Sequence, residues 1–569
     1  MEKATRRYVV IGGIVAAAVV AMVAWFALSI ASTASQGRDL QSQVSAARAS
    51  VAALDTTAAA RDLAALAQSA TALDEATQGV AWGLAEALPV IGDSARATTA
   101  FAAAAEDLAA AALPLVNAVE GAESTTAKVM AVLGAPDEVA ILRDAAQAAS
   151  ADLAGFTPDG LRFGLAEAMS QAQEGLPSLV STLDSFTAAA GPLSSMLGRD
   201  GPTTWLVMSQ NPAELRGTGG LFNAYLIVTL DKGALTILEA GSRKQLDKQF
   251  PRDSQIPYWT TIDPGTSMTW GPVLGEWASF NIPADFPTVA RLASAGMAQR
   301  GTPVDGVVAI DPAIIAAILA GTGSVEHKGV TLDTTNAVDF FTKAIYEDFP
   351  GFADVAAKDE LAMGLTYATI DAATKRPLDT GSLIPALTEA IEGGHLKAWS
   401  SVEADQAWLM GTPVAGSLDQ NPDEMVVGFA NGTGGKLDPY VTREVIVDAS
   451  TCAVDKRVTV TIRMQNDAPE GLPEYVDVTL DQDGIPDPSV PSGFTRTFVT
   501  VYAPGTLADG DWSGLQSALQ DGTAVETSFG GTGERPIWTI PVELDRGEAT
   551  ELVLEFTVPR CSLAEVPEG

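Results

Sequence analysis

The chain has 569 residues, of which 47% are hydrophobic, and its 34 basic and 71 acidic side chains give a formal net charge of −37. This hydrophobic content is typical of a chain that folds around cores, and the length allows roughly three or four domains of about 150 residues. The negative charge argues against nucleic acid as a partner, because polyanions repel one another. Only two histidines occur, His327 and His395. A histidine zinc site or a Ser-His-Asp triad is therefore disfavoured, whereas carboxylate–metal or arginine chemistry stays open.

Near its start the chain carries an uncharged run, residues 8–31, preceded by a short basic segment, residues 1–7. As a helix the run would be about 36 Å long, enough to cross a bilayer, and the basic flank predicts a cytoplasmic N-terminus. A cleaved signal peptide is the alternative, because Ser32-Thr33-Ala34 resembles a cleavage site, but its apolar core would span only about 7–15 residues. We therefore expect a cytoplasmic tail over 1–7, a single transmembrane helix over 8–31 and an extracytoplasmic remainder.

Residues 32–200 are rich in alanine, and leucine and valine recur at helical spacing. This pattern predicts helices folded back on one another, because alanine is the best helix former and small faces let helices approach closely. We expect breaks at five steps that end in proline, at 88–89, 113–114, 135–136, 157–158 and 176–177. The region would be a stalk above the membrane or a helical subdomain packed on the next domain.

Residues 201–435 alternate between strand and helix patterns, which indicates an α/β domain whose sheet is covered by helices. Strands are expected at 203–210, 222–230, 234–240, 304–310, 396–400 and 425–430. Helices are expected from 284, from Asp311-Pro312, from about 335, and over 357–375, 380–392 and 402–410.

The loop 211–220, between the first two of these strands, combines a carboxylate, a guanidinium, a hydroxyl and three glycines. Glycine permits positive φ, so successive backbone N–H groups can converge on an anion, and an arginine suits a phosphate. If the strands are neighbours, Arg216 of the loop and Arg243, after the third strand, would face one shared anion site. The alternative is that the glycines serve tight turns and that Glu214 and Arg216 form a local ion pair.

Residues 436–569 alternate apolar and polar side chains in short runs with frequent turns, which predicts an Ig-like β-sandwich. Strands are expected at 441–447, 457–464, 475–480, 494–502, 537–544 and 551–558. The two cysteines, Cys452 and Cys561, flank most of this region. Outside the membrane a disulfide between them is expected, with two free buried thiols as the alternative.

Three motifs resemble those of a large family: Asn-x-Ala-Glu-Leu-Arg-x-Thr-Gly-Gly at 211–220, Val-Asp-Gly-Val-Val-Ala-Ile-Asp-Pro at 304–312 and Asn-Gly-Thr-Gly-Gly-Lys-Leu-Asp at 431–438. The resemblance covers most of residues 80–465. Members are single-pass envelope proteins of high-GC Gram-positive bacteria, and their shared domain is one of unknown function. The resemblance implies a compartment and an architecture, and it implies no activity.

The order of elements is also similar to that of the LytR-CpsA-Psr glycopolymer transferases, which act on polyprenyl-pyrophosphate-linked polymers outside the membrane. This similarity implies their fold for the α/β domain, and it places Arg216, Arg243 and Lys358 where basic groups would hold a pyrophosphate. Asn211 stands where a magnesium-holding carboxylate is expected. The comparison therefore implies a retained fold with catalysis lost, because transfer needs a cation and several basic groups.

We thus expect a membrane-anchored, extracytoplasmic cell-envelope protein that binds or presents an anionic lipid-linked or polymeric glycan without catalysis. The alternatives are an active glycopolymer phosphotransferase and a purely structural module that binds an envelope protein. No catalytic residue, metal ligand or cofactor is assigned, although a divalent cation fits an acidic chain. The candidate ligand-binding residues are Asn211, Glu214, Arg216, Thr218, Gly219, Gly220, Arg243 and Lys358.

Overall fold

The computed structural model describes scattered residues between 61 and 77 and the ranges 79–89, 91–118, 125–162, 165–251, 254–481, 484–507, 510–533 and 535–561. The tail and transmembrane helix predicted over 1–7 and 8–31 lie outside the described residues. The described chain forms two compact units. One contains the residues up to Pro202 together with Leu230–Ala234, and the other contains Thr203–Thr229 and the chain from Leu235 onward.

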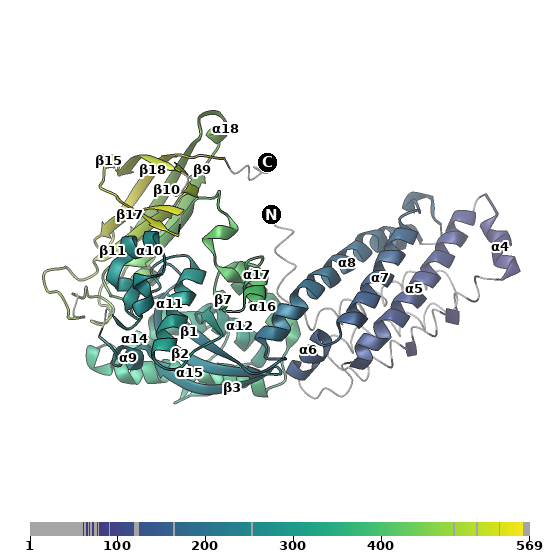
Figure 1. The fold of residues 1–569 in the computed structure, drawn as a ribbon, viewed down its shortest axis with the longest axis horizontal. Coiled ribbons are helices and arrows are strands. Elements are labelled where there is room, and N and C mark those ends of the chain that lie inside the picture. The colour runs from purple at the N-terminus through teal and green to yellow at the C-terminus, as the bar shows by residue number, and fades with distance from the viewer. Residues whose placement is uncertain are drawn as a thin grey trace. The chain divides into compact units, whose positions relative to one another are not determined.

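The first unit is helical, with α4 (Val80–Glu86), α5 (Gly92–Ala118), α6 (Thr125–Leu133), α7 (Pro136–Leu153) and α8 (Leu165–Met196). Helix α7 packs against both α5 and α8 (Figure 1). Their shared core is built from alanine and leucine, such as Ala105 and Leu108 of α5 and Leu142 and Ala146 of α7. The small side chains let these helices pack closely, as the sequence pattern predicts.

Two of the predicted breaks in this unit are wrong. Helix α5 continues through Pro114, and α8 continues through Pro177 and Pro192. A proline inside a helix removes one backbone hydrogen bond and bends the axis, but it does not prevent the next turn from forming. Here Leu115 and Leu179, just beyond two of these prolines, are buried in the common core. Packing therefore holds each helix together across its proline.

One described helix, α5, is long and apolar enough to cross a membrane by length and composition, with a mean hydropathy of 1.4 over an 18-residue window. It is not the N-terminal segment that the sequence predicts. Of that window, 56% is buried inside the structure. A core helix of a soluble protein meets the same criterion, so α5 by itself does not define a membrane topology.

The second unit begins with a five-stranded sheet in the order β3-β2-β1-β4-β7. The strands are β1 (Thr203–Asn211), β2 (Leu221–Asp231), β3 (Ala234–Ser242), β4 (Gly306–Ile310) and β7 (Leu396–Ser400). Strand β4 runs parallel to β1 and antiparallel to β7. All five strands lie within two residues of their predicted positions.

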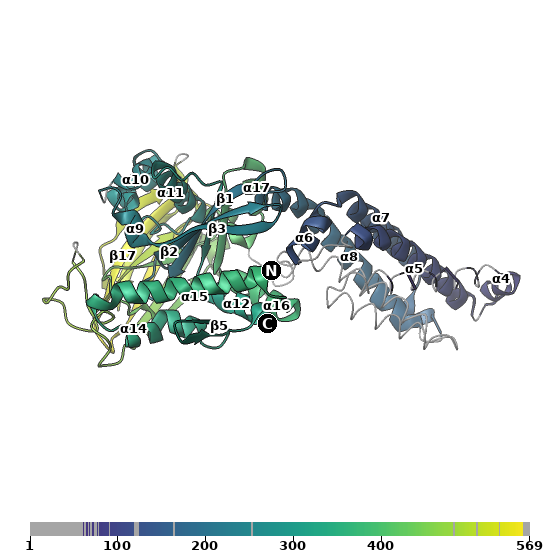
Figure 2. The ribbon, with the colours of Figure 1, turned by 90° about the horizontal axis from the view of Figure 1, so that it is seen from below.

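Helices cover both faces of this sheet (Figure 2). Along β1 and β4 successive side chains point to opposite faces, so Leu206 and Val307 enter one core while Val308 and Ile310 border the other. The helices are α9 (Arg243–Asp247), α10 (Pro264–Trp270), α11 (Phe286–Gln299), α12 (Pro312–Thr322), α13 (Ala337–Asp339), α14 (Ile345–Asp348), α15 (Val355–Lys375), α16 (Thr380–Glu392) and α17 (Glu403–Leu409). A π-helical turn, Phe340–Ala344, joins α13 to α14. A small hairpin of β5 (Val325–His327) and β6 (Val330–Leu332) precedes them.

The C-terminal part is strand-rich and consists mainly of two antiparallel sheets, ordered β15-β14-β18-β10-β9 and β16-β17-β11-β8. Val460 of β10 and Val499 of β11 belong to one core, so the two sheets pack on each other as in a β-sandwich. The strands are β8 (Val426–Asn431), β9 (Val441–Asp448), β10 (Arg457–Asn466), β11 (Thr495–Tyr502), β14 (Gly514–Gln520), β15 (Thr523–Ala524), β16 (Ser528–Thr532), β17 (Arg535–Leu544) and β18 (Ala549–Thr557).

Three features of this region differ from expectation. Strand β8, expected in the α/β domain that ends at 435, pairs instead with β11 of the C-terminal sheet. The strand expected at 475–480 does not form, because its backbone serves a different loop: the Val476 carbonyl accepts from Lys436 N and Leu480 N donates to Thr433 O. Strands β14 and β16 were not expected from their sequences.

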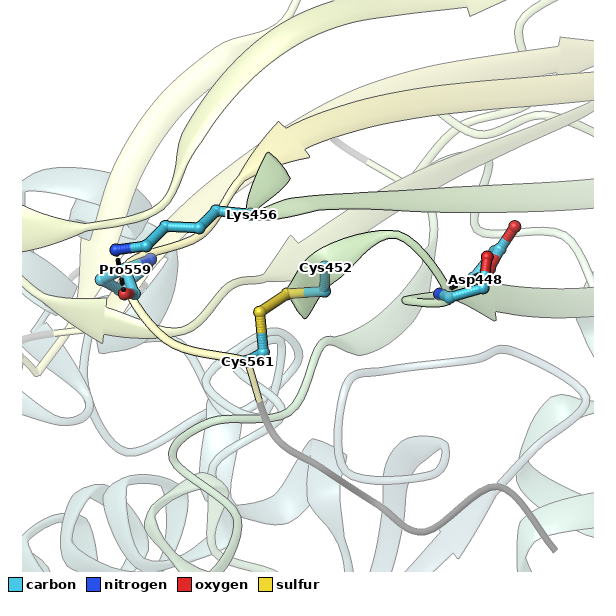
Figure 3. Close-up of a disulfide and its surroundings, with 6 residues drawn as sticks. Asp448, Cys452, Lys456, Pro559 and Cys561 are labelled. Carbon is cyan, nitrogen blue, oxygen red and sulfur yellow. Dashed lines mark hydrogen bonds between the residues drawn. A yellow bond between two sulfur atoms is a disulfide. The ribbon is translucent and has the colours of Figure 1, made fainter. Parts of the chain in front are cut away.

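Cys452 and Cys561 form a disulfide with their Cα atoms 5.8 Å apart (Figure 3), which confirms the predicted pair. Cys452 begins the short helix α18 (Cys452–Asp455) after β9, and Cys561 follows β18. Beside the disulfide, the Lys456 Nζ donates to the Pro559 carbonyl at 3.1 Å. The bond therefore fastens the turn between β9 and β10 to the end of β18.

Candidate functional site

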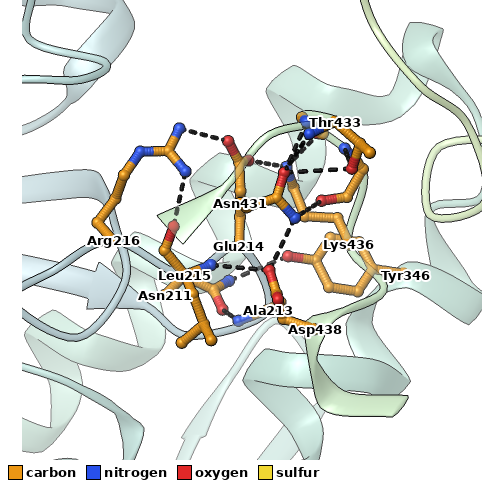
Figure 4. Close-up of polar contacts among 12 residues, drawn as sticks. Asn211, Ala213, Glu214, Leu215, Arg216, Tyr346, Asn431, Thr433, Lys436 and Asp438 are labelled. Carbon is orange, nitrogen blue, oxygen red and sulfur yellow. Dashed lines mark hydrogen bonds and ion pairs between the residues drawn. The ribbon is translucent and has the colours of Figure 1, made fainter. Parts of the chain in front are cut away.

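The loop 211–220 starts with Asn211, the last residue of β1. Its Nδ2 donates to the Phe341 carbonyl at 3.1 Å and to the Tyr346 hydroxyl at 3.0 Å, and its Oδ1 accepts from Ala213 N at 2.9 Å (Figure 4). These bonds use both donor hydrogens of the amide. Asn211 therefore anchors the start of the loop to the π-helical turn and α14.

Glu214, Arg216 and Lys436 form a buried ionic cluster, and each is less than 9% exposed. The Arg216 Nη2 lies 2.7 Å from the Glu214 Oε1, and the Lys436 Nζ pairs with the other carboxylate oxygen. Burial by itself would raise the pKa of Glu214, but the charges of Lys436 and Arg216 lower that pKa from 4.5 to about 2. The carboxylate is therefore ionised at neutral pH and bound on both sides.

The motif at 431–438 is bonded directly to the loop 211–220 (Figure 4). The Leu215 N donates to the Asp438 Oδ2 at 2.9 Å, and the Asn431 N donates to the Leu215 carbonyl at 3.0 Å. Asp438 also pairs with Arg443 of β9. The two motifs thus join the first sheet to the C-terminal strands, and Glu214 with Arg216 forms the local ion pair that was the alternative expectation.

The glycines of the loop serve close packing. Gly219 has φ +134°, which disfavours other residues, and a Cβ on Gly220 would lie 2.3 Å from the Asn211 carbonyl carbon. The Thr218 hydroxyl accepts from Gln210 Nε2 at 2.8 Å and from Asn281 Nδ2 at 3.3 Å. Neighbouring residues of the protein therefore pack against the loop and bond its polar groups.

Arg243 is held elsewhere. It starts α9, and its Nη1 lies 2.5 Å from the Asp247 Oδ2 one turn later. Arg216 and Arg243 are thus bound by different carboxylates, and neither lines the pocket described next. Each guanidinium is paired with a carboxylate within four residues along the chain, and the convergence of both on one shared anion site stays a prediction.

A narrow pocket lies at the edge of the first sheet, and it brings together two of the candidate residues, Asn211 and Lys358. Its volume is about 30 Å³, which is room for about two water molecules. One wall is polar, from the ends of β1 and β3. The other wall is apolar and comes from α12, the π-helical turn, α14 and α15, including Ile315, Phe341, Ile345 and Ala362.

Lys358 lies at this pocket on the first turn of α15 and is only 3% exposed. Its Nζ lies 2.6 Å from the Asp359 Oδ1 and faces the rings of Tyr346 and Tyr475 at 5.5 and 5.8 Å. The Lys244 Nζ approaches the same carboxylate at 3.6 Å, and burial lowers the pKa of Lys244. Two ammonium groups therefore share one carboxylate beside the pocket.

Sequence reasoning missed Lys436, Tyr346 and Tyr475 as members of these clusters. Lys436 directly follows two glycines in the motif 431–438, and its place in that motif could have marked it as a candidate. The two tyrosines carry no such signal. They come from α14 and from an irregular segment far along the chain, and only the fold brings them to Lys358.

Comparison with known proteins gives one match. Residues 200–346 match the model of a family described as "Protein of unknown function (DUF4012)". The matched range contains the motifs at 211–220 and 304–312. No curated protein and no solved structure matches the chain. The predicted resemblance to a family whose domain is of unknown function is therefore confirmed over residues 200–346, which match that family model.

Proposed function

We propose that the α/β domain binds an anionic amphiphile, of the lipid-linked phosphate type, in the pocket beside Lys358 and does so without catalysis. The observation that carries this proposal is a buried ammonium group, paired with Asp359, in a pocket wall that also presents the apolar side chains of Ile315, Phe341 and Ile345. An ammonium group favours a phosphate or pyrophosphate, and apolar side chains favour a hydrocarbon chain. The proposal keeps the expected setting, a membrane anchor over 8–31 and an extracytoplasmic domain that receives or presents a lipid-linked glycan.

The charge around the pocket supports an anionic head group. Lys358 and Lys244 share Asp359, and Arg243, which is paired with Asp247, belongs to the same electrostatic neighbourhood. Three cations thus face two carboxylates in a chain whose net charge is −37. A local excess of positive charge in so acidic a protein concentrates anions at this place.

The hydrocarbon part requires the apolar wall to open, because the present volume suits about two water molecules. Phe341 in this wall belongs to the π-helical turn Phe340–Ala344, and Ile345 follows it. Turns of this kind are rare and often occur at functional sites. We propose that this turn is the part of the wall that moves when the ligand enters.

The absence of catalysis in this proposal rests on Asn211. The resemblance to the transferases places a magnesium-holding carboxylate at this position, but an amide stands there. Its donors and its oxygen are engaged by Phe341, Tyr346 and Ala213. A neutral amide whose oxygen already accepts a hydrogen bond is a poor ligand for magnesium, which prefers carboxylates and phosphate oxygens.

The test is a titration of the full chain in detergent with farnesyl phosphate, a short polyprenyl phosphate. Farnesol lacks the phosphate and inorganic pyrophosphate lacks the chain, so both should bind at least tenfold more weakly. Lys358→Met should weaken farnesyl phosphate binding at least tenfold. Lys375→Met is the matched control, because Lys375 lies on the same helix with its side chain 71% exposed. Equal binding of farnesol, or equal effects of the two substitutions, would contradict the proposal.

A second candidate function is a structural one, and the buried cluster of Glu214 favours it. In that case the motif residues join the two parts of the unit, and the protein serves as an interaction module of the envelope. The same titration separates the candidates. Failure of the wild-type protein to bind farnesyl phosphate, together with strong destabilisation by Glu214→Gln, would leave the structural function.

A further inference from the structure

We propose that strand β9 (Val441–Asp448) is a docking edge, to which an extended, basic segment of a partner protein adds as a further strand. This surface belongs to the C-terminal sheets and is independent of the pocket at Lys358. A sheet edge presents backbone N–H and C=O groups that only another extended backbone satisfies along its length. The chemistry of the partner then follows from the side chains around that edge.

The two edge strands of the C-terminal sheet β15-β14-β18-β10-β9 differ in length. One end is β15, a strand of two residues, Thr523–Ala524, and so short an edge gives little room for pairing. The other end is β9, which has eight residues and pairs with β10 from Val441 to Asp448. Among the described residues the sheet ends at β9. Only one end of the sheet is therefore protected by being short.

Apolar side chains are exposed along this edge. Val445, Ile446 and Val447 are 40%, 40% and 44% exposed, and Val454 of the adjoining helix α18 is 91% exposed. Successive side chains of a strand point to opposite faces, so Ile446 lies on one face and the two valines lie on the other. Single exposed apolar residues are ordinary, but three in succession on an open edge strand mark a surface that another chain covers.

The charges beside the edge select the partner. An open groove of about 530 Å³ crosses β9, β10 and β18 on the outer face of the sheet. Within it Arg463 lies between two carboxylates, at 3.1 Å from Glu444 and 2.8 Å from Glu551, and Asp521 adds a third. Arg443 also borders the groove, but it is paired with Asp438. Glu551 on β18 and Asp521 lie two or more strands away from β9, but the edge strand itself carries Glu444 and Asp448, whereas its Arg443 is paired with Asp438. The edge is therefore net negative, which favours lysine or arginine on an added strand.

A second copy of the chain fits this edge poorly. Antiparallel pairing of two β9 strands would bring their acidic grooves together, and each chain carries a net charge of −37. Like charges opposite one another on paired strands are destabilising. The partner strand is therefore basic on the face that meets the groove and apolar on the face that meets Val445 and Val447.

The edge is held in place before any partner arrives. β10 pairs with β9 along the whole strand, and the disulfide between Cys452 and Cys561 fastens the turn after β9 to the end of β18 (Figure 3). A template that is already ordered loses little conformational entropy when a peptide binds. The disulfide thus supports docking at β9 as well as the fold.

The test uses two octapeptides with blocked ends, one of alternating lysine and valine and one of alternating glutamate and valine. Their binding to the full chain is measured by fluorescence anisotropy with a terminal dye. We expect the lysine peptide to bind at least tenfold more tightly than the glutamate peptide. Equal binding of the two, or binding of neither, would overturn the proposal.

The site is then located with a double substitution, Ile446→Lys together with Val447→Lys, which should weaken binding of the lysine peptide at least tenfold. Both side chains are substantially exposed, so the thermal unfolding of this variant should match the wild type. Leu238→Lys is the matched control, because Leu238 is 60% exposed on β3, the edge strand of the sheet β3-β2-β1-β4-β7. This substitution should leave peptide binding unchanged. An unaltered affinity in the double variant would overturn the assignment to β9.

Two other occupants have distinct results. Sedimentation that shows a dimer of the wild type, and a monomer of the double variant, would assign the edge to a second copy. A tenfold gain in peptide affinity after removal of residues 562–569 would assign it to the chain's own C-terminal segment. Either result replaces the partner that we propose.

Discussion

Two buried ammonium groups face the same ring in this protein, and they have different surroundings. Lys436 and Lys358 lie 5.5 and 5.8 Å from the centre of the Tyr475 ring, and each is at most 5% exposed. Lys436 binds the Glu214 carboxylate and the Gly434 carbonyl, and Arg216 completes its cluster. Lys358 binds Asp359, which it shares with Lys244, and it borders a pocket.

This difference shows that burial of a charge does not by itself identify a binding site. A buried charge whose partners are all within the protein stabilises the fold, because removing one member of the cluster leaves the other charges unpaired. A buried charge that shares its partner and lines a cavity retains capacity for an external anion. The first description fits the motif loop at 211–220, and the second fits the start of α15.

The largest expected effect on stability comes from disrupting the buried cluster of Glu214, Arg216 and Lys436. Glu214→Gln removes the negative charge between Arg216 and Lys436 and leaves two buried cations without it, so we expect a loss of about 3–5 kcal/mol of unfolding free energy. Chemical denaturation of the full chain measures this. Glu360→Gln is the control, since its pair with Lys328 is exposed and should be worth less than about 1 kcal/mol. A similar loss in both variants would contradict the role of Glu214.

The same cluster predicts an acid sensitivity. The folded state lowers the pKa of Glu214 from 4.5 to about 2, so its contribution is fully present above about pH 4.5 and is lost as pH falls toward 2. The shift corresponds to about 3 kcal/mol. Denaturation of the wild type and of Glu214→Gln between pH 6 and pH 2 should show a steeper loss in the wild type. Parallel curves would mean that Glu214 titrates normally.

Asn211 touches both regions, so its substitution sharpens the comparison. Asn211→Ala leaves the Phe341 carbonyl, the Tyr346 hydroxyl and the Ala213 N–H without this partner, and we expect a loss of about 2 kcal/mol. Thermal unfolding followed by circular dichroism measures it. The control is Asn223→Ala, at another amide that lines the pocket. A loss below about 0.5 kcal/mol for Asn211→Ala would show that water replaces these bonds.

The smallest expected effect is on stability at the pocket. Lys358→Met keeps a long apolar stem and removes a buried charge, while Asp359 keeps Lys244 at 3.6 Å. We expect the unfolding free energy to change by less than about 1 kcal/mol, because Asp359 keeps Lys244 as its partner and is therefore not left as an unpaired buried charge. Chemical denaturation checks this under the conditions used for Glu214→Gln. A loss of unfolding free energy as large as that of Glu214→Gln would show that Lys358 mainly stabilises the fold.

Local patterns determined much of the secondary structure. The strands β1 to β4 follow runs of β-branched and aromatic residues between glycines, and Asp311-Pro312 begins α12 as predicted, with the Asp311 carboxylate accepting from Ala313 N. Such signals act over a few residues, so a single sequence contains them. The cysteine pair was also predictable, because only one pairing exists for two cysteines.

The tertiary structure decided what lies between elements. Packing in the helical core allows α5 to continue past Pro114. Strand β8 pairs with β11, which is distant in sequence, and so belongs to a C-terminal sheet. Local sequence patterns indicated most of the strands and helices of the α/β domain, and they marked the loop 211–220 as unusual. Only the fold decided that Glu214 binds Lys436 from 222 positions away, that Arg243 turns to Asp247, and that Lys358 meets a pocket. The physical reason is that a charged side chain pairs with whichever opposite charge the folded chain brings within about 4 Å, and that distance is unrelated to separation along the chain.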